Sequence, residues 1–133
     1  MHNAPTFRID DIDLFERPTP LRLPFRFGAM TLTAAPQAFV RVALRFADGA
    51  VATGMTAELM VPKWFDKRPS LSDDDNLDQL RRSLHLAAEA YRSDATPRSA
   101  FGHSSAHHAA IVDEGARNDL PPLAAAFGAA EID

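Results

Sequence analysis

The sequence predicts an α+β fold in which a three-stranded antiparallel β-meander is followed by two to three helices. Three observations carry this prediction. Apolar and polar residues alternate on either side of an Asp-Gly turn, leucines recur at helical spacing after residue 73, and 133 residues suit one domain with one modest core. We expect a single domain over residues 1–133, with strands at about 7–15, 38–46 and 50–59 and helices at about 73–93, 99–117 and 123–133.

The hairpin over residues 39–59 is the central element. Its first strand alternates an apolar set with a set that carries two arginines, namely Val40, Val42, Leu44 and Phe46 against Arg41, Ala43 and Arg45. This period of two places the apolar set on one face. Asp48-Gly49 then forms the turn, because glycine tolerates the positive φ that tight hairpins need. An isolated hairpin is marginal in water, so a third strand and helices should cover it.

Residues 7–15 are the candidate third strand. Their apolar side chains change parity midway, from Phe7 and Ile9 to Ile12 and Leu14. A change of parity within one strand indicates a β-bulge, here near Asp10-Asp11.

Two long connections flank the hairpin. Residues 17–33 contain Pro18, Pro20 and Pro24, which lack the backbone donor of a central strand, so a loop is predicted there. Residues 55–70 hold Trp64, the only tryptophan, among cations. Connections of this length are uncommon and often functional. Trp64 either packs onto its own domain or forms a lid or pocket wall against a ligand or a neighbouring domain.

The first helix has a clear start and a clear apolar side. Ser72 is a good N-cap, and the acids at 73–75 sit where the helix dipole favours negative charge. We interpret these acids as capping residues rather than a calcium loop, because the spaced ligands and glycine of such a loop are missing. One stripe joins Leu77, Leu80, Leu84, Ala88 and Tyr91. The helix should end before Pro97.

The second helix is marked only weakly, by Phe101, Ala106, Ala110, Ile111 and Gly115. His103 and His107 are four residues apart, so both can face one metal ion, and His108 is adjacent. No HExxH arrangement and no third ligand is evident nearby. We therefore favour histidines that are exposed or contact a partner, with metal binding as the alternative.

The segment 123–133 is small, apolar and compatible with a helix. It has no cation near its last residue and no glycine stop signal. We expect this helix to belong to a longer chain that was cut at this point.

Composition bears on partners and location. The formal net charge of −4 predicts no nucleic-acid partner. No apolar run reaches the length of a membrane span, so no membrane partner is expected. The first residues lack an export signal and the chain has no cysteine, so a cytoplasmic location is expected.

The order of these elements resembles the N-terminal capping domain of the enolase superfamily, in its mandelate racemase and muconate lactonizing enzyme branch. The resembling residues are Ile12-Asp13-Leu14-Phe15, the stretch from Pro18 through Pro24-Phe25-Arg26-Phe27-Gly28, Phe39-Val40-Arg41-Val42 with Asp48-Gly49, and Gly54 with Glu58. The similarity spans about residue 7 to the end. Many relatives have a compact Gly-x-Gly-Glu, whereas three residues separate Gly54 from Glu58 here.

The resemblance implies a C-terminal barrel domain that would hold magnesium and carry the acid and base residues. In the family these remove the proton next to a substrate carboxylate, as in acid-sugar dehydratases, racemases and cycloisomerases. This chain then supplies no catalytic residue and no metal ligand, and it is inactive alone. Its two long connections, about 17–33 and 53–69, would cover the barrel mouth and bind the substrate. The candidate substrate-binding residues are Arg22, Arg26, Met30, Met55, Lys63 and Trp64.

The predicted partners are the barrel domain, a small carboxylate substrate and further copies in a homo-oligomer. A second hypothesis is a stand-alone binding or homodimerisation module without catalytic activity. A third is a small hydrolase using His103 or His107 as base. It is disfavoured because neither Ser104 nor Ser105 lies in a Gly-x-Ser-x-Gly turn.

Overall fold

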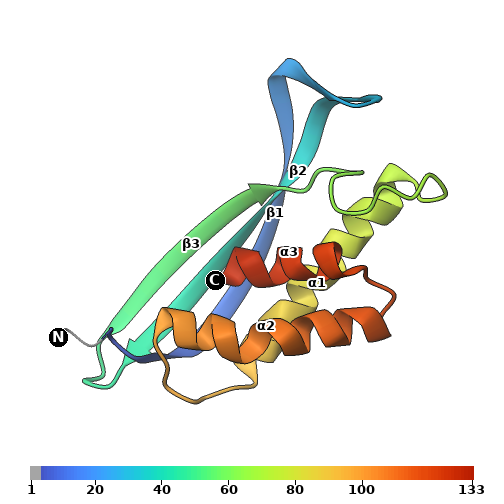
Figure 1. Cartoon of the computed structure of the whole chain (residues 1–133). Coiled ribbons are helices and arrows are strands. Elements are labelled where there is room, and N and C mark those ends of the chain that lie inside the picture. Colours follow the sequence, from blue (N-terminus) through green and yellow to red (C-terminus); the bar gives the residue numbers. More distant parts are fainter. Residues whose placement is uncertain (1–3) are drawn as a thin grey trace.

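The computed structural model describes residues 4–133 as one antiparallel sheet in the order β1-β2-β3, with three helices packed against it (Figure 1). The predicted α+β class, a three-stranded meander followed by helices, is confirmed. The elements are β1 (Phe7–Phe27), β2 (Met30–Phe46), β3 (Val51–Leu59), α1 (Asp73–Arg92), α2 (Ala100–Arg117) and α3 (Pro122–Ile132). Within residues 4–133, no helix combines the length and the apolar character that crossing a bilayer requires.

The predicted hairpin and bulge are confirmed by the strand register. Ile9 pairs with Leu44 while Asp11 pairs with Ala43, which leaves Asp10 as the extra residue. Gly49 has a φ of 86° in the turn that joins β2 to β3. The apolar side of β2 is covered, with Val40 fully buried, and the arginine side faces solvent and pairs with acids of β1.

The predicted loop over residues 17–33 is instead a strand arm. Beyond the end of β3, β1 and β2 continue as a two-stranded hairpin, and we call residues 18–36 the arm (Figure 1). Pro18 pairs with Pro36 there, and Pro20 pairs with Ala34. Prolines are tolerated because β1 is an edge strand, whose outer side needs no donor. A register shift between Pro20 and Phe25 takes up the residues around Pro24.

The first helix forms as predicted. Ser72 accepts a hydrogen bond from the Asp75 backbone, and the Asp75 side chain accepts one from the Ser72 backbone, which completes a capping box. The whole predicted stripe of α1 is buried.

Helix α3 packs tightly against α1. It is apolar on nearly all sides, which is typical of a buried helix. At Gly128 the two backbones are so close that a Cβ atom would lie 2.1 Å from the Ser83 carbonyl oxygen.

The predicted apolar side of α2 is wrong in part. Its buried stripe is His103, His107, Ile111 and Gly115, whereas Phe101, Ala106 and Ala110 are exposed. The His103 Nε2 atom lies 2.8 Å from the carbonyl oxygen of Phe7. The His107 ring lies 3.2 Å from the Asp94 carboxylate. These two histidines are therefore interior residues that join α2 to the start of β1 and to the α1–α2 loop, rather than exposed ones.

Candidate functional site

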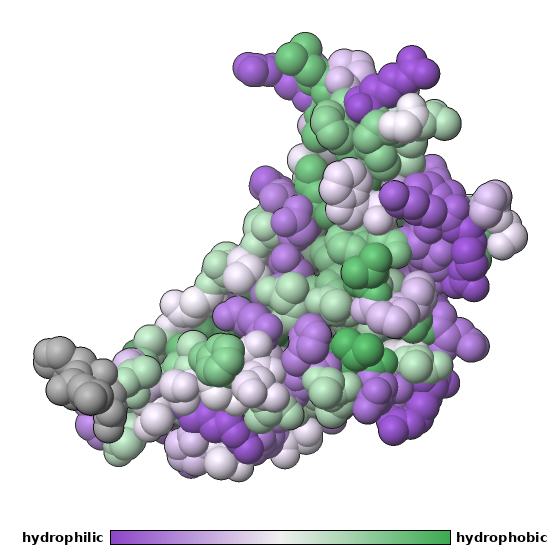
Figure 2. Space-filling model, in the orientation of Figure 1, coloured by the Kyte–Doolittle hydropathy of each residue, from purple (hydrophilic) through white to green (hydrophobic). Residues whose placement is uncertain are grey.

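An apolar cleft of about 790 Å³ lies where the arm, the segment 60–71 and α3 meet. We call it the apical cleft. In Figure 2 apolar side chains gather below the arm and continue over the adjoining body. Leu23, Phe25, Trp64 and Leu123 line the cleft, yet each side chain is 53–72 % exposed. Large apolar side chains this exposed, gathered at one place, mark a surface that contacts another molecule or domain.

The arm and the segment 60–71 touch across the cleft. The rings of Phe27 and Trp64 meet edge to face, with centroids 5.2 Å apart. Phe25 lies beside Phe27 at 5.7 Å. On the floor, Phe65 meets Phe127 of α3 at 5.1 Å. Aromatic contacts therefore join the arm to segment 60–71, and segment 60–71 to α3.

Segment 60–71 is held in place by buried polar groups at the start of α1. The carboxylate of Asp66 accepts hydrogen bonds from Arg68 at 2.7 Å and from the Gln79 amide at 2.9 Å. These donors hold the pKa of the Asp66 carboxyl well below its usual range, the Arg68 guanidinium having the largest effect. Asn76 accepts a hydrogen bond from the Lys63 backbone at 3.0 Å. This network anchors the segment that carries Trp64 to the start of α1.

The only charged residues that line the apical cleft within the described chain are two glutamates, Glu58 and Glu131. Burial raises the pKa of the Glu131 carboxyl, and the neighbouring charge of Glu58 raises it further. The Thr56 hydroxyl donates to the Glu131 backbone carbonyl at 2.6 Å, which ties β3 to the end of α3. The cleft therefore suits apolar or cationic groups and disfavours anions.

Four of the six predicted substrate-binding residues lie at this end of the molecule. Trp64 lines the apical cleft. Arg22, Arg26 and Met30 belong to the arm but do not line the cleft. The two arginines are exposed and Met30 is half-buried. The arm thus presents an apolar side to the cleft and its cations elsewhere.

The other two predicted residues are placed differently. The Lys63 ammonium donates to the carbonyl oxygens of Arg68, at 3.0 Å, and of Leu71, so it helps to build its own segment. Met55 lies on β3, near a different pocket. The structure therefore does not bring these two residues together with the arm.

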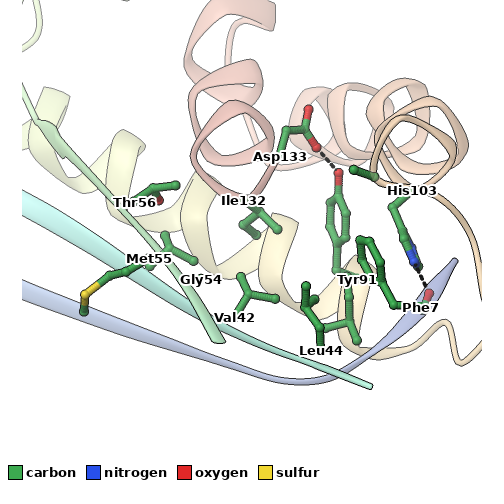
Figure 3. A pocket seen from close by; sticks show the side chains of 13 residues that line it. Phe7, Val42, Leu44, Gly54, Met55, Thr56, Tyr91, His103, Ile132 and Asp133 are labelled. Carbon is green, nitrogen blue, oxygen red and sulfur yellow. Dashed lines mark hydrogen bonds between the residues drawn. The ribbon is translucent and has the colours of Figure 1, made fainter. Parts of the chain in front are cut away.

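The pocket beside Met55 has a volume of about 360 Å³ and lies between the sheet and the helix ends (Figure 3). Val42 and Leu44 make part of its apolar lining. Tyr91 donates a hydrogen bond to the Asp133 carboxylate, and burial raises the pKa of the Tyr91 phenol far above its usual range. This second pocket has few polar groups, and most of them are paired with one another or with the backbone, whereas the His103 Nδ1 atom is buried without a hydrogen-bond partner.

No three histidine or acidic side chains converge on one point among residues 4–133. His103 and His107 therefore have no third ligand in the described chain.

Sequence reasoning missed Leu23, Phe25 and Leu123 as cleft residues. A signal existed for the arm, because Leu21, Leu23, Phe25 and Phe27 recur at every second position. Pro24, together with Pro18 and Pro20 before Leu21, obscured this strand pattern. Nothing local marks Leu123, whose role depends on where α3 packs.

Comparison of the chain with protein-family models, with curated proteins and with solved structures finds no match. The resemblance to the enolase superfamily therefore rests on the sequence features quoted above.

Proposed function

We propose that this chain is the substrate-capping domain of an enolase-superfamily enzyme that abstracts the proton next to a carboxylate. The carrying observation is that the two long segments flanking the hairpin converge on one exposed apolar cleft. In the family the corresponding segments close over the mouth of a barrel domain. In this proposal the apical cleft is the surface that the barrel covers.

The exposed area of the chain supports a covered surface. The chain exposes 8092 Å², whereas a compact protein of its 14.5 kDa exposes about 6,900 Å². The difference of about 1,200 Å² exceeds the roughly 800 Å² that one partner buries in a standard interface. The arm projects beyond the helices and the rest of the sheet (Figure 1).

Charge distinguishes the apical cleft from the part of the arm that carries arginines. The apical cleft contains Glu58 and Glu131 and no cation, so it is a poor site for a carboxylate. Arg22 and Arg26 lie on the same arm outside the cleft and are exposed. Arginine pairs with carboxylates in a bidentate fashion. We therefore assign barrel contact to the cleft, and substrate contact to the two arginines and Met30. Trp64 is the one cleft residue that we also assign to the substrate.

The chemical step belongs to the barrel in this proposal. The described residues offer no magnesium site. Magnesium, when bound in the barrel, stabilises the negative charge that develops as the α-proton leaves. The capping domain contributes by excluding water and orienting the substrate. The cytoplasmic location expected from the sequence remains part of the same proposal.

The deciding experiment compares the 133-residue chain with the product of the same reading frame continued past Asp133. Support requires roughly 200 or more further residues of alternating strands and helices. It also requires magnesium-dependent exchange of the α-proton of acid sugars in deuterated water, lost in the short chain. A reading frame that ends at Asp133, with a short chain that is stable alone, refutes the proposal and leaves a stand-alone binding module.

A pair of variants of the continued chain tests whether Trp64 contacts the substrate. Trp64→Ala should raise KM about tenfold or more, because the substrate loses an apolar contact. Phe101→Ala removes an aromatic side chain that is 81 % exposed on α2 and does not line the cleft, so KM should stay within twofold. Equal effects of the two substitutions would remove Trp64 from the site.

A further inference from the structure

We propose that the free edge of β3 is the interface through which two copies of this chain pair, forming one continuous six-stranded sheet. β3 is the last strand of the sheet, and within residues 4–133 nothing pairs with its outer side. Eight of its nine residues are exposed. This inference does not depend on the proposed function, because it rests on the unpaired backbone edge of β3, of which only the last two residues, Glu58 and Leu59, also line the apical cleft.

The two edges of the sheet differ sharply in how they are protected. β1 carries Pro18, Pro20 and Pro24 and two register shifts, all of which hinder pairing with another strand. β3 contains no proline and no lysine, and its register with β2 is unbroken from Val51 to Leu59. A long edge without these features is a template for strand addition. The contrast within one sheet points to β3 as an edge that is covered.

A second copy fits this edge by symmetry. In an antiparallel pair across a two-fold axis, residues that face each other must have the same parity, because only alternate residues direct their backbone groups outward. An axis through Met55 meets this condition and pairs all nine residues, with Val51 opposite Leu59 of the partner copy. Axes centred elsewhere along β3 leave residues unpaired at the ends.

The same register is favourable for charge. Glu58 is the only charged residue of β3, and it falls opposite Ala52 of the second copy. Like charges that face each other would destabilise a strand pair, and in this register none do. The axis brings Met55 against its own copy, and this side chain is 61 % exposed in the single chain. Burying the two methionine side chains against each other adds apolar contact at the centre of the interface.

Pairing also places the second pocket beside the seam. A two-fold axis perpendicular to the sheet keeps the helices of both copies on the same face. Gly54, Met55 and Thr56 of β3 line this pocket (Figure 3). The interface is thus continuous with an apolar region that the single chain leaves partly open.

Cysteine substitution gives the sharpest test, because the chain has no cysteine of its own. Facing Cα atoms of an antiparallel pair lie about 4.5–5.5 Å apart, within the range of a disulfide. The Met55→Cys chain should therefore become mostly a covalent dimer under mild oxidation. Val51→Cys is the matched control, because its two copies would be about 26 Å apart at eight residues of strand rise. Mixed Val51→Cys and Leu59→Cys chains should cross-link to each other.

Sedimentation equilibrium supplies the non-covalent test. The unmodified chain should be a dimer at 100 µM, and Met55→Lys should weaken it at least tenfold by placing two ammonium groups at the axis. Leu123→Lys introduces the same charge at an exposed leucine of α3, and the dimer should persist. A monomeric unmodified chain overturns the proposal, as does a dimer that tolerates Met55→Lys or cross-links equally through Val51→Cys. The proposed function is decided by the continued reading frame and by α-proton exchange, neither of which measures dimerisation, so the two failures are distinguishable.

Discussion

Gly128→Ala tests the packing of α3 on α1, which forms the floor of the apical cleft. In an isolated helix this substitution would gain about 1 kcal/mol, since alanine is the better helix former. In this chain the new Cβ would lie 2.1 Å from the Ser83 carbonyl oxygen and 2.8 Å from the Leu84 nitrogen. These are backbone atoms and cannot rotate away, so the helices must separate by about 1 Å. Overpacking costs about 3 kcal/mol at the upper end of its range. The net expected loss is about 2 kcal/mol.

Urea unfolding followed by far-ultraviolet circular dichroism measures this loss. Gly54→Ala is the matched control, because nothing lies within 4 Å of the Cβ that it adds. It should leave the free energy of unfolding unchanged or raise it by about 0.5 kcal/mol, since alanine restricts the unfolded chain. If the Gly128→Ala chain had a free energy of unfolding equal to or above that of the original chain, the two helices would not pack as closely as described.

Three further predictions concern polar groups. Asp66→Ala should lower the free energy of unfolding by about 2–3 kcal/mol, because it leaves the buried Gln79 amide without its acceptor. The double variant Asp66→Ala/Gln79→Leu should regain part of the lost free energy of unfolding in the same urea titration. If it regains none, the hydrogen bond between Asp66 and Gln79 does not explain the loss. Burial holds the pKa of His107 below its unfolded value of about 6.5, despite the nearby Asp94 carboxylate. The free energy of unfolding should therefore fall as pH drops below about 6.5. His107→Gln should make it less dependent on pH in this range. If the variant and the original chain had the same pH profile, His107 would not be the group responsible. Ser72→Ala should cost about 1 kcal/mol by thermal unfolding, and a cost near zero would mean that the capping box is not formed in solution.

Elements with strong local signals could be predicted from the sequence. The Asp48-Gly49 turn, the bulge at Asp10 and the capped start of α1 each depend on residues within a few positions of one another. Alternation in β2 fixed which side chains face the helices, and Val40 is fully buried as expected. In these cases local preference and tertiary packing favour the same structure.

The arm and α2 could not be predicted in full, for two different reasons. Proline excludes a central strand, but whether a strand lies at the edge is a property of the sheet and not of the residue. In α2 the buried positions carry His103 and His107, while Phe101 is 81 % exposed, so hydrophobicity indicated the wrong side. The Phe7 carbonyl oxygen hydrogen-bonds one ring and the Asp94 carboxylate lies beside the other, although His103 Nδ1 and His107 Nε2 are buried without a hydrogen bond. Such partners come from distant parts of the chain.

The candidate site shows the same limit, and its charges constrain any function assigned to it. The apical cleft is assembled from the arm, from segment 60–71 and from α3, so no single stretch of sequence contains its pattern. The sequence did not predict that Glu58 and Glu131 line the cleft. Their negative charge disfavours carboxylate binding in the cleft, and no sequence motif indicates a carboxylate site there. Under the proposed function, a carboxylate substrate would be recognised by Arg22 and Arg26 outside the cleft. In the chain continued past Asp133, Arg26→Ala should then raise KM for such a substrate, whereas Glu58→Gln, at a cleft residue, should not.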